Sequence, residues 1–124
     1  MSPVTICASC RDAVAKMMDP VEEWARRHRV PTNRIVAAEF GCDRQADGAH
    51  DYLEDIVTAL NHRGWHWAFY SFREDAWDRM DYEVGPGGLG AAYWKAVDRG
   101  ETPGRPWKDN PLWRVLQDGL HAER

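Results

Sequence analysis

Glu39 is the residue of this sequence that is best placed to act on or bind a ligand. It follows the apolar run 35–38, which is typical of a buried strand, and it precedes a Phe-Gly pair. Ligands of a parallel sheet gather at the carboxyl ends of its strands, so a carboxylate at such an end is a candidate functional group. The structural alternative is an ion pair with an arginine such as Arg34, Arg44 or Arg73.

A second apolar run, WHWAFYSF at residues 65–72, is aromatic along most of its length. It predicts a strand that is apolar on both faces, as in a parallel sheet covered by helices. Its end brings Tyr70 and Phe72 beside the end of the first strand. A carboxylate next to aromatic rings is a common setting for sugars, because pyranose C–H faces stack on rings and hydroxyls bond to the charged group. We therefore expect a carbohydrate site around Glu39.

Two other motifs are weaker candidates. Cys7 and Cys10 form a C-x-x-C pair, which fits a redox pair or half a zinc site, but no second pair has zinc-ligand spacing. The odd count of three cysteines argues against a disulfide framework. Residues 85–90 match G-x-G-x-x-G, but no second parallel strand follows, so we do not expect dinucleotide binding. The sequence thus predicts no metal and no cofactor.

Helical periodicity accounts for most of the remaining chain. It predicts helices at residues 11–29, 49–62, 89–98 and 110–120. Pro20 interrupts the first, which restarts with Asp19 as N-cap, and Asn110 caps the last. In the second helix one apolar stripe contains Tyr52, Leu53, Ile56, Val57 and Leu60.

The two strands, 35–40 and 65–72, flank the helix at 49–62 and form a βαβ unit with it. Alternation along the first strand places Ala37 and Glu39 on the same face. Trp67 falls on the opposite face of its strand from Tyr70, so we expect Trp67 to pack against a helix.

Composition and charge narrow the class of protein. The chain has 124 residues, of which 44% are apolar and seven are tryptophan, so one domain with a packed core is expected. Its net charge of −4 does not suggest a nucleic-acid binder. No apolar stretch is long enough to span a membrane, and the first ten residues do not resemble a signal peptide. These features do not indicate where in or outside the cell the protein acts.

The order of these segments resembles the C-terminal part of glycoside hydrolase family 5, the cellulase-like (β/α)8 barrels. The resemblance runs from about Pro20 to Leu120 and is most specific in 35–83, where E-F-G, a helix and an aromatic strand follow one another. It implies that Glu39 is the nucleophile of a retaining hydrolase and that Tyr70 is the aromatic platform for the sugar. It also implies that the last βα loop borders the cleft. This loop holds Arg73, Glu74, Asp75, Trp77 and Asp78.

The resemblance covers only part of a barrel. The family's second carboxylate lies in an N-E-P motif that this sequence lacks, and a complete barrel takes about 250 residues. We therefore expect an α/β fold, a partial (β/α)8 barrel holding only C-terminal strand-helix-strand-helix units. The single domain is 1–124, in which 1–12 match nothing and 73–109 form a long loop region on the active-site side.

These features predict a glycoside-hydrolase-like chain for a β-linked glycan, inactive unless another chain supplies the acid/base. The alternative is a non-catalytic, self-assembling remnant or carbohydrate-binding module. The intrachain helices can shield only one face of strand 65–72, and the other face, which lines the barrel in full-length relatives, has no cover in so short a chain. We therefore expect a homo-oligomer, most simply a two-fold dimer with an interface above ~2,000 Å² and Glu39 near it.

Overall fold

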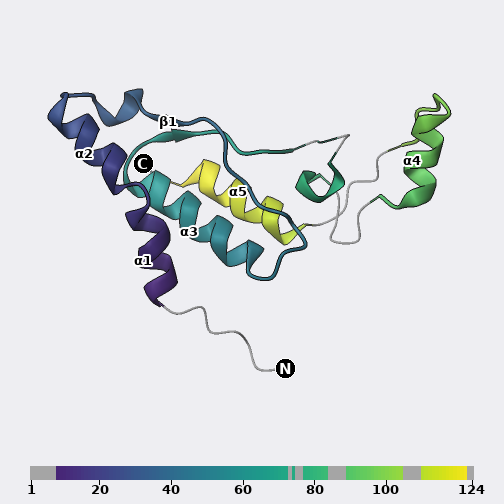
Figure 1. Ribbon diagram of the computed structural model, residues 1–124, viewed down its shortest axis with the longest axis horizontal. Helices are drawn as coiled ribbons and strands as arrows, with labels where there is room; N and C mark the ends of the chain where they lie inside the picture. Colours follow the sequence, from purple (N-terminus) through teal and green to yellow (C-terminus); the bar gives the residue numbers. More distant parts are fainter. Residues whose placement is uncertain (1–7, 73, 75–76, 84–88, 105–109, 123–124) are drawn as a thin grey trace.

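The computed structural model of the protein describes residues 8–72, 74, 77–83, 89–104 and 110–122. Within these residues the fold mixes helices and strands, and helices predominate (Figure 1). The helices are α1 (Ala8–Lys16), α2 (Asp19–Arg27), α3 (Ala49–His62), α4 (Ala91–Asp98) and α5 (Pro111–His121). The strands are β1 (Val36–Ala37) and β2 (His66–Trp67), and the 3₁₀ helices are η1 (Thr32–Arg34) and η2 (Asp78–Met80).

The central βαβ unit that the sequence predicts is confirmed. β1 and β2 pair in parallel, Val36 opposite His66, and α3 connects them. The strands are shorter than the predicted ranges 35–40 and 65–72, yet their pairing continues beyond them. The amide of Ala68 donates to the carbonyl of Ala37 at 2.9 Å, and Tyr70 donates to Phe40 at 2.7 Å. The two chains therefore stay side by side up to Glu39 and Tyr70.

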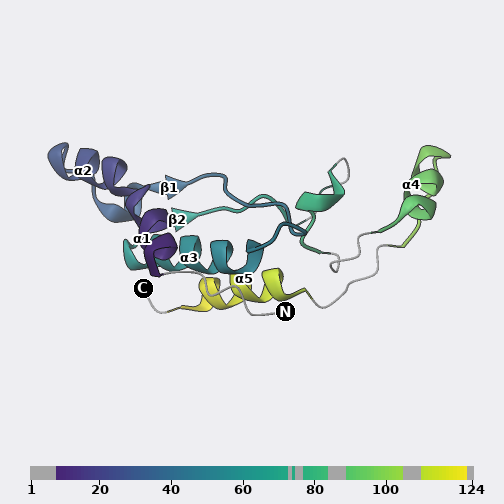
Figure 2. The same ribbon diagram turned by 60° about the horizontal axis from the view of Figure 1, so that its bottom comes forward.

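One face of the strand pair, the inner face, lies against the helices. Figure 2 shows α3 and α5 together on one side of β1 and β2. Trp67 belongs to this face, as predicted, because its indole Nε1 donates to Asn61 of α3 at 2.9 Å. The opposite, outer face carries exposed side chains. They are Val36, Ala38, His66 and Ala68.

The predicted alternation along β1 is wrong beyond Ala38. Ala37 pairs with Trp67 in the ladder and is partly buried, whereas Glu39 is exposed and Phe40 packs against the core cluster. The physical reason is that regular strand geometry ends at Ala37, so the period of two no longer applies. Glu39 therefore does not share the face of Ala37.

The hydrophobic core lies between α3 and α5. Leu53 of α3 and Leu116 of α5 are fully buried, and Tyr82 closes the same cluster. Burying each leucine stabilises the fold by about 1.5–3 kcal/mol. The bounds of α3 are those predicted, and most of its predicted apolar stripe faces this cluster. The helix stops before Gly64, which takes the left-handed φ of +67° that favours glycine.

The first predicted helix, 11–29, is two helices with a break at Met17 and Met18. The N-cap of α2 is Met18 rather than Asp19, because the Asp19 carboxylate pairs with Arg63 at 2.8 Å instead of capping the helix. The apolar residues at helical spacing that predict this helix, Val14, Met17, Met18, Val21 and Trp24, are not part of the core cluster. Met17 is 76% exposed, and Trp24 is also exposed and stacks on His28.

The last two helices were predicted closely. α5 begins at Pro111, and the Asn110 side chain accepts a hydrogen bond from the amide of Leu112, as expected for an N-cap. α4 begins at Ala91, two residues later than predicted. Both views show α4 apart from the other helices (Figures 1 and 2). The architecture supports the α/β class, while two short strands do not define a barrel.

Candidate functional site

The candidate site lies just beyond the carboxyl ends of β1 and β2. Glu39 follows β1 by two residues, and Tyr70 follows β2 by three. The hydrogen bond from the Tyr70 amide to the Phe40 carbonyl brings these two segments together at 2.7 Å. The peptide bond between Tyr70 and Ser71 is cis. The predicted meeting of the two strand ends is therefore observed.

A cavity of about 480 Å³ opens at this place. It brings together three of the residues that the sequence predicts for the site: Glu39, Tyr70 and Trp77. Phe40, Gly41 and Met80 complete its lining. One acidic residue and three aromatic residues thus line a common space, which suits a polar ligand with an apolar face.

Gly41 allows the close approach of the two strand ends. A Cβ atom at this position would overlap the carbonyl oxygen of Tyr70. Real Cβ atoms do not approach a backbone oxygen this closely, so only glycine fits without a shift of the chain. The glycine of the E-F-G motif therefore serves the pairing of 39–41 with Tyr70.

Residues 77–83, which include Trp77, lie back against Ser71. The amide of Ser71 donates to the carbonyl of Met80 at 3.1 Å, and the amide of Tyr82 donates to Ser71 at 3.0 Å. The fully buried carboxylate of Asp81 accepts hydrogen bonds from the amides of Glu74 and Glu83 at 3.2 and 2.9 Å. These bonds hold the wall of the cavity that faces Glu39.

Glu39 itself is exposed, and within the described residues its carboxylate has no hydrogen bond or ion pair. The structural alternative, an ion pair with an arginine, is not observed for Arg34 or Arg44. Arg44 pairs with Asp78 instead, at 2.9 Å. Arg73, the third candidate, lies outside the described residues. The carboxylate is therefore available to a ligand.

The remaining predicted site residues lie elsewhere or support the loop. Phe72 does not line the cavity, because its ring packs on Trp113 of α5 with 5.1 Å between centroids. Glu74 accepts a hydrogen bond from the amide of Trp77 at 3.3 Å and thus stabilises the loop. Arg73 and Asp75 lie outside the described residues, as do Cys7 and 85–88 of the glycine motif.

A buried phenol supports the turn that follows Gly41. The Tyr82 hydroxyl donates to the Cys42 carbonyl at 2.6 Å and accepts from the Cys42 amide at 2.8 Å. Burial raises the pKa of Tyr82 strongly, and burial also raises the pKa of the Cys42 thiol. Tyr82 therefore stays protonated and donates its hydrogen bond at neutral pH. Sequence reasoning did not single out this residue.

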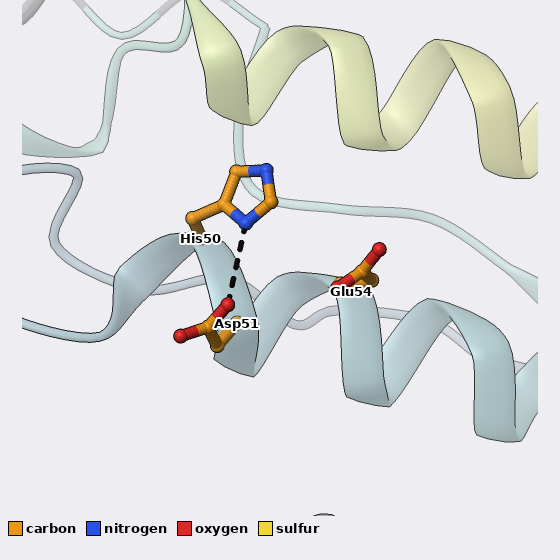
Figure 3. A group of neighbouring side chains, drawn as sticks. All are labelled: His50, Asp51 and Glu54. Carbon is orange, nitrogen blue, oxygen red and sulfur yellow. Dashed lines mark ion pairs between the residues drawn. The ribbon is translucent and has the colours of Figure 1, made fainter. Parts of the chain in front are cut away.

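The start of α3 carries a second group of polar side chains, His50, Asp51 and Glu54 (Figure 3). Their potential ligand atoms lie within 4.8 Å of one another, and His50 Nδ1 is 3.5 Å from Asp51 Oδ1. The group is largely exposed, and the positive end of the helix dipole disfavours a cation there. We assign no metal to it.

Comparison of the chain with protein-family models, with curated proteins and with solved structures finds no match. The resemblance to glycoside hydrolase family 5 therefore stays a prediction. Among the described residues, no helix is both long and apolar enough to cross a membrane.

Proposed function

We propose that the chain carries the nucleophile half of a retaining glycoside-hydrolase site and that its ligand is a β-linked glycan or glycoside. The cavity that Glu39, Tyr70 and Trp77 line at the ends of two parallel strands carries this proposal. The two rings offer surfaces for the C–H face of a pyranose, and the carboxylate reaches its polar edge.

Glu39 would act on the anomeric carbon. Its carboxylate oxygen forms a bond to that carbon while the bond to the leaving-group oxygen breaks, and the leaving oxygen keeps the electron pair. Water then hydrolyses the glycosyl ester. A nucleophile of this kind must be accessible to the substrate, which agrees with the exposed Glu39 side chain.

A poor leaving group needs a proton from a second carboxylate about 5–5.5 Å from the nucleophile. Among the described residues that line the cavity, Glu39 is the only acid. We therefore propose that another chain supplies the acid/base. The second candidate function is carbohydrate binding without turnover. The single acid in the described cavity lining favours it too, because aromatic rings and one acid suffice for binding.

A covalent trap separates the two functions. In 2,4-dinitrophenyl 2-deoxy-2-fluoro-β-glucoside and its cellobiose analogue, the leaving group departs without protonation, so labelling needs only the nucleophile. We expect a single adduct on the wild-type chain, mapped to Glu39 by peptide mass spectrometry. Glu39→Gln should abolish the adduct. Glu54→Gln, an exposed glutamate on α3, is the matched control and should be labelled normally.

Calorimetry with cello-oligosaccharides completes the test. Binding without an adduct in the wild-type chain would favour the non-catalytic module. Absence of both binding and labelling would contradict both candidate functions. An adduct that persists in Glu39→Gln would show that another group is the nucleophile.

Self-association of the chain remains part of this proposal. The outer face of the strand pair is uncovered among the described residues, and Val36 is 58% exposed there. Parallel strands normally have both faces covered. A second copy or a complementing chain on this face would cover it, and the residues beyond β1 and β2 would then lie near the interface.

A further inference from the structure

We propose that Arg44 is the positioning residue that holds Trp77 in the wall of the Glu39 cavity; this inference rests on the proposed function. The Arg44 side chain is only 1% exposed. Its Nη2 donates to the Asp78 carboxylate at 2.9 Å, and its Nε donates to the Asp78 backbone carbonyl at 3.2 Å. A buried guanidinium thus binds the residue that directly follows Trp77.

The contacts join the two segments that form the cavity. Arg44 lies three residues after Gly41, and its own amide donates to the carbonyl of Arg79 at 3.0 Å. Asp78 begins η2, whose N-cap is Trp77 and whose last residue is Met80. Trp77 and Met80 both line the cavity. Arg44 therefore fixes η2 and its two flanking cavity residues relative to the segment that carries Glu39.

The shape of the guanidinium suits this task. It presents several donors in one plane, so one side chain can bind a carboxylate and a carbonyl of the same residue together. Net stabilisation does not explain such a pair, because the cost of burying the charges offsets much of their attraction. A fixed geometry of η2 is the gain that the arrangement offers.

A second ion pair joins the same segments and supplies a matched control. Arg79 Nε lies 2.6 Å from the carboxylate of Asp43, but the two side chains are 52% and 30% exposed. Exposed pairs contribute little because water and salt screen them. In the Arg44–Asp78 pair the two side chains are 1% and 26% exposed, so the arginine is the group that differs in burial. The pair with the buried arginine should therefore determine the position of Trp77, and the pair with the exposed arginine should not.

Fluorine NMR of 5-fluorotryptophan-labelled protein tests the placement without any sugar. The chain has seven tryptophans, and Trp77→Phe identifies the resonance of Trp77. In Arg44→Met we expect this resonance to move toward that of free 5-fluorotryptophan, while the resonance of the buried Trp65 stays unchanged. Arg79→Met should leave both resonances in place. An unmoved Trp77 resonance in folded Arg44→Met would overturn the inference.

Should Arg44→Met fail to fold, Asp78→Asn keeps the arginine and removes the charge of its partner. In Asp78→Asn, a shift of the Trp77 fluorine resonance supports the inference, and an unchanged resonance overturns it. The readout is specific, because a loss of global stability alone would not move the Trp77 resonance of the folded molecules relative to that of Trp65.

Labelling kinetics connect the placement to the site. Arg44→Met leaves Glu39 intact, so the concentration of dinitrophenyl fluoroglucoside for half-maximal labelling should rise about tenfold while the maximal rate changes little. Absence of labelling in the wild type would contradict the proposed function, and the fluorine spectra would still test the placement of Trp77. Unchanged half-saturation despite a moved resonance would overturn the role of Arg44 at the site.

Discussion

The two faces of the β1–β2 pair differ sharply in how they are packed. On the inner face, Leu53 and Leu116 are fully buried between α3 and α5, whereas on the outer face Val36 and His66 are exposed. The candidate cavity lies beyond the carboxyl ends of the two strands, where Phe40 packs against the core cluster. The comparison teaches that the inner face supplies the stability that positions the site, and that the outer face is the one that the proposed self-association would cover.

The largest effect is expected in the core of α5. Leu116→Ala removes a fully buried side chain and should lower the free energy of unfolding by about 2–5 kcal/mol. Leu120→Ala, on the same helix but 52% exposed, is the matched control and should change it by less than about 0.5 kcal/mol. Urea denaturation followed by circular dichroism measures both. Equal effects would show that α5 does not pack as described.

Tyr82→Phe tests the support beneath the candidate cavity. The change leaves the backbone N–H and C=O of Cys42 without their phenol partner, so we expect a loss of about 1–3 kcal/mol. Tyr93→Phe on α4 is the control and should have little effect, because that helix lies apart from the core (Figure 1). A neutral Tyr82→Phe would mean that water replaces the phenol freely.

The same tyrosine predicts an alkaline dependence. Because burial raises the pKa of Tyr82, the folded protein holds the phenolic proton more tightly than the unfolded chain does. Its contribution is complete below about pH 10, the ordinary tyrosine pKa. It falls above that pH by up to about 1.4 kcal/mol per pH unit. The stability difference between wild type and Tyr82→Phe should therefore shrink from pH 9 to pH 11; a constant difference would contradict this.

Gly119→Ala tests how closely α5 packs on α3. Alanine normally stabilises a helix by about 1 kcal/mol over glycine. Here a Cβ atom would overlap Val57, so we expect a net loss of about 1–3 kcal/mol. Val57→Ala should recover part of this loss in the double variant, which thermal denaturation can measure. A stabilising Gly119→Ala would show that the contact between the two helices is loose.

The smallest effect on the single chain is expected on the outer face. Val36→Lys should change the free energy of unfolding by less than about 0.5 kcal/mol, because the side chain is already exposed. It should nevertheless weaken self-association, because the charge would be buried in an interface formed there. Light scattering over a dilution series measures the mass. A folded wild-type monomer at all concentrations would contradict the proposed oligomer.

The sequence predicted α3 and α5 better than the packing of the first two helices. The bounds of α3 and the cap of α5 follow from strong local signals, an apolar stripe and an Asn-Pro pair. The stripe of 11–29 has a similar period, yet Met17 and Trp24 are exposed. Periodicity identifies an apolar face but not what covers it, because the cover comes from distant parts of the chain.

The candidate site was predictable where it depends on strand ends. Glu39 and Tyr70 each follow a recognisable apolar run, and parallel pairing places the ends of such runs together. The pairing of Arg44 with Asp78 could not be predicted, because it joins a turn to the short helix η2, 34 residues away, and no local pattern determines how the two meet. Phe72 was misplaced for the same reason: its contact with Trp113 depends on the path of the chain after Ser71.

The close approach at Gly41 sets a rule for engineering this pocket. A library that randomises the cavity lining to change ligand preference can vary Trp77 and Met80, which line the space from the segment opposite Glu39. It must keep glycine at position 41, because any side chain there would displace the Tyr70 carbonyl and so move the Tyr70 ring away from the Glu39 carboxylate. At Gly104, by contrast, an added Cβ atom would meet none of the described residues within 4 Å, so this position suits a tag or fluorophore.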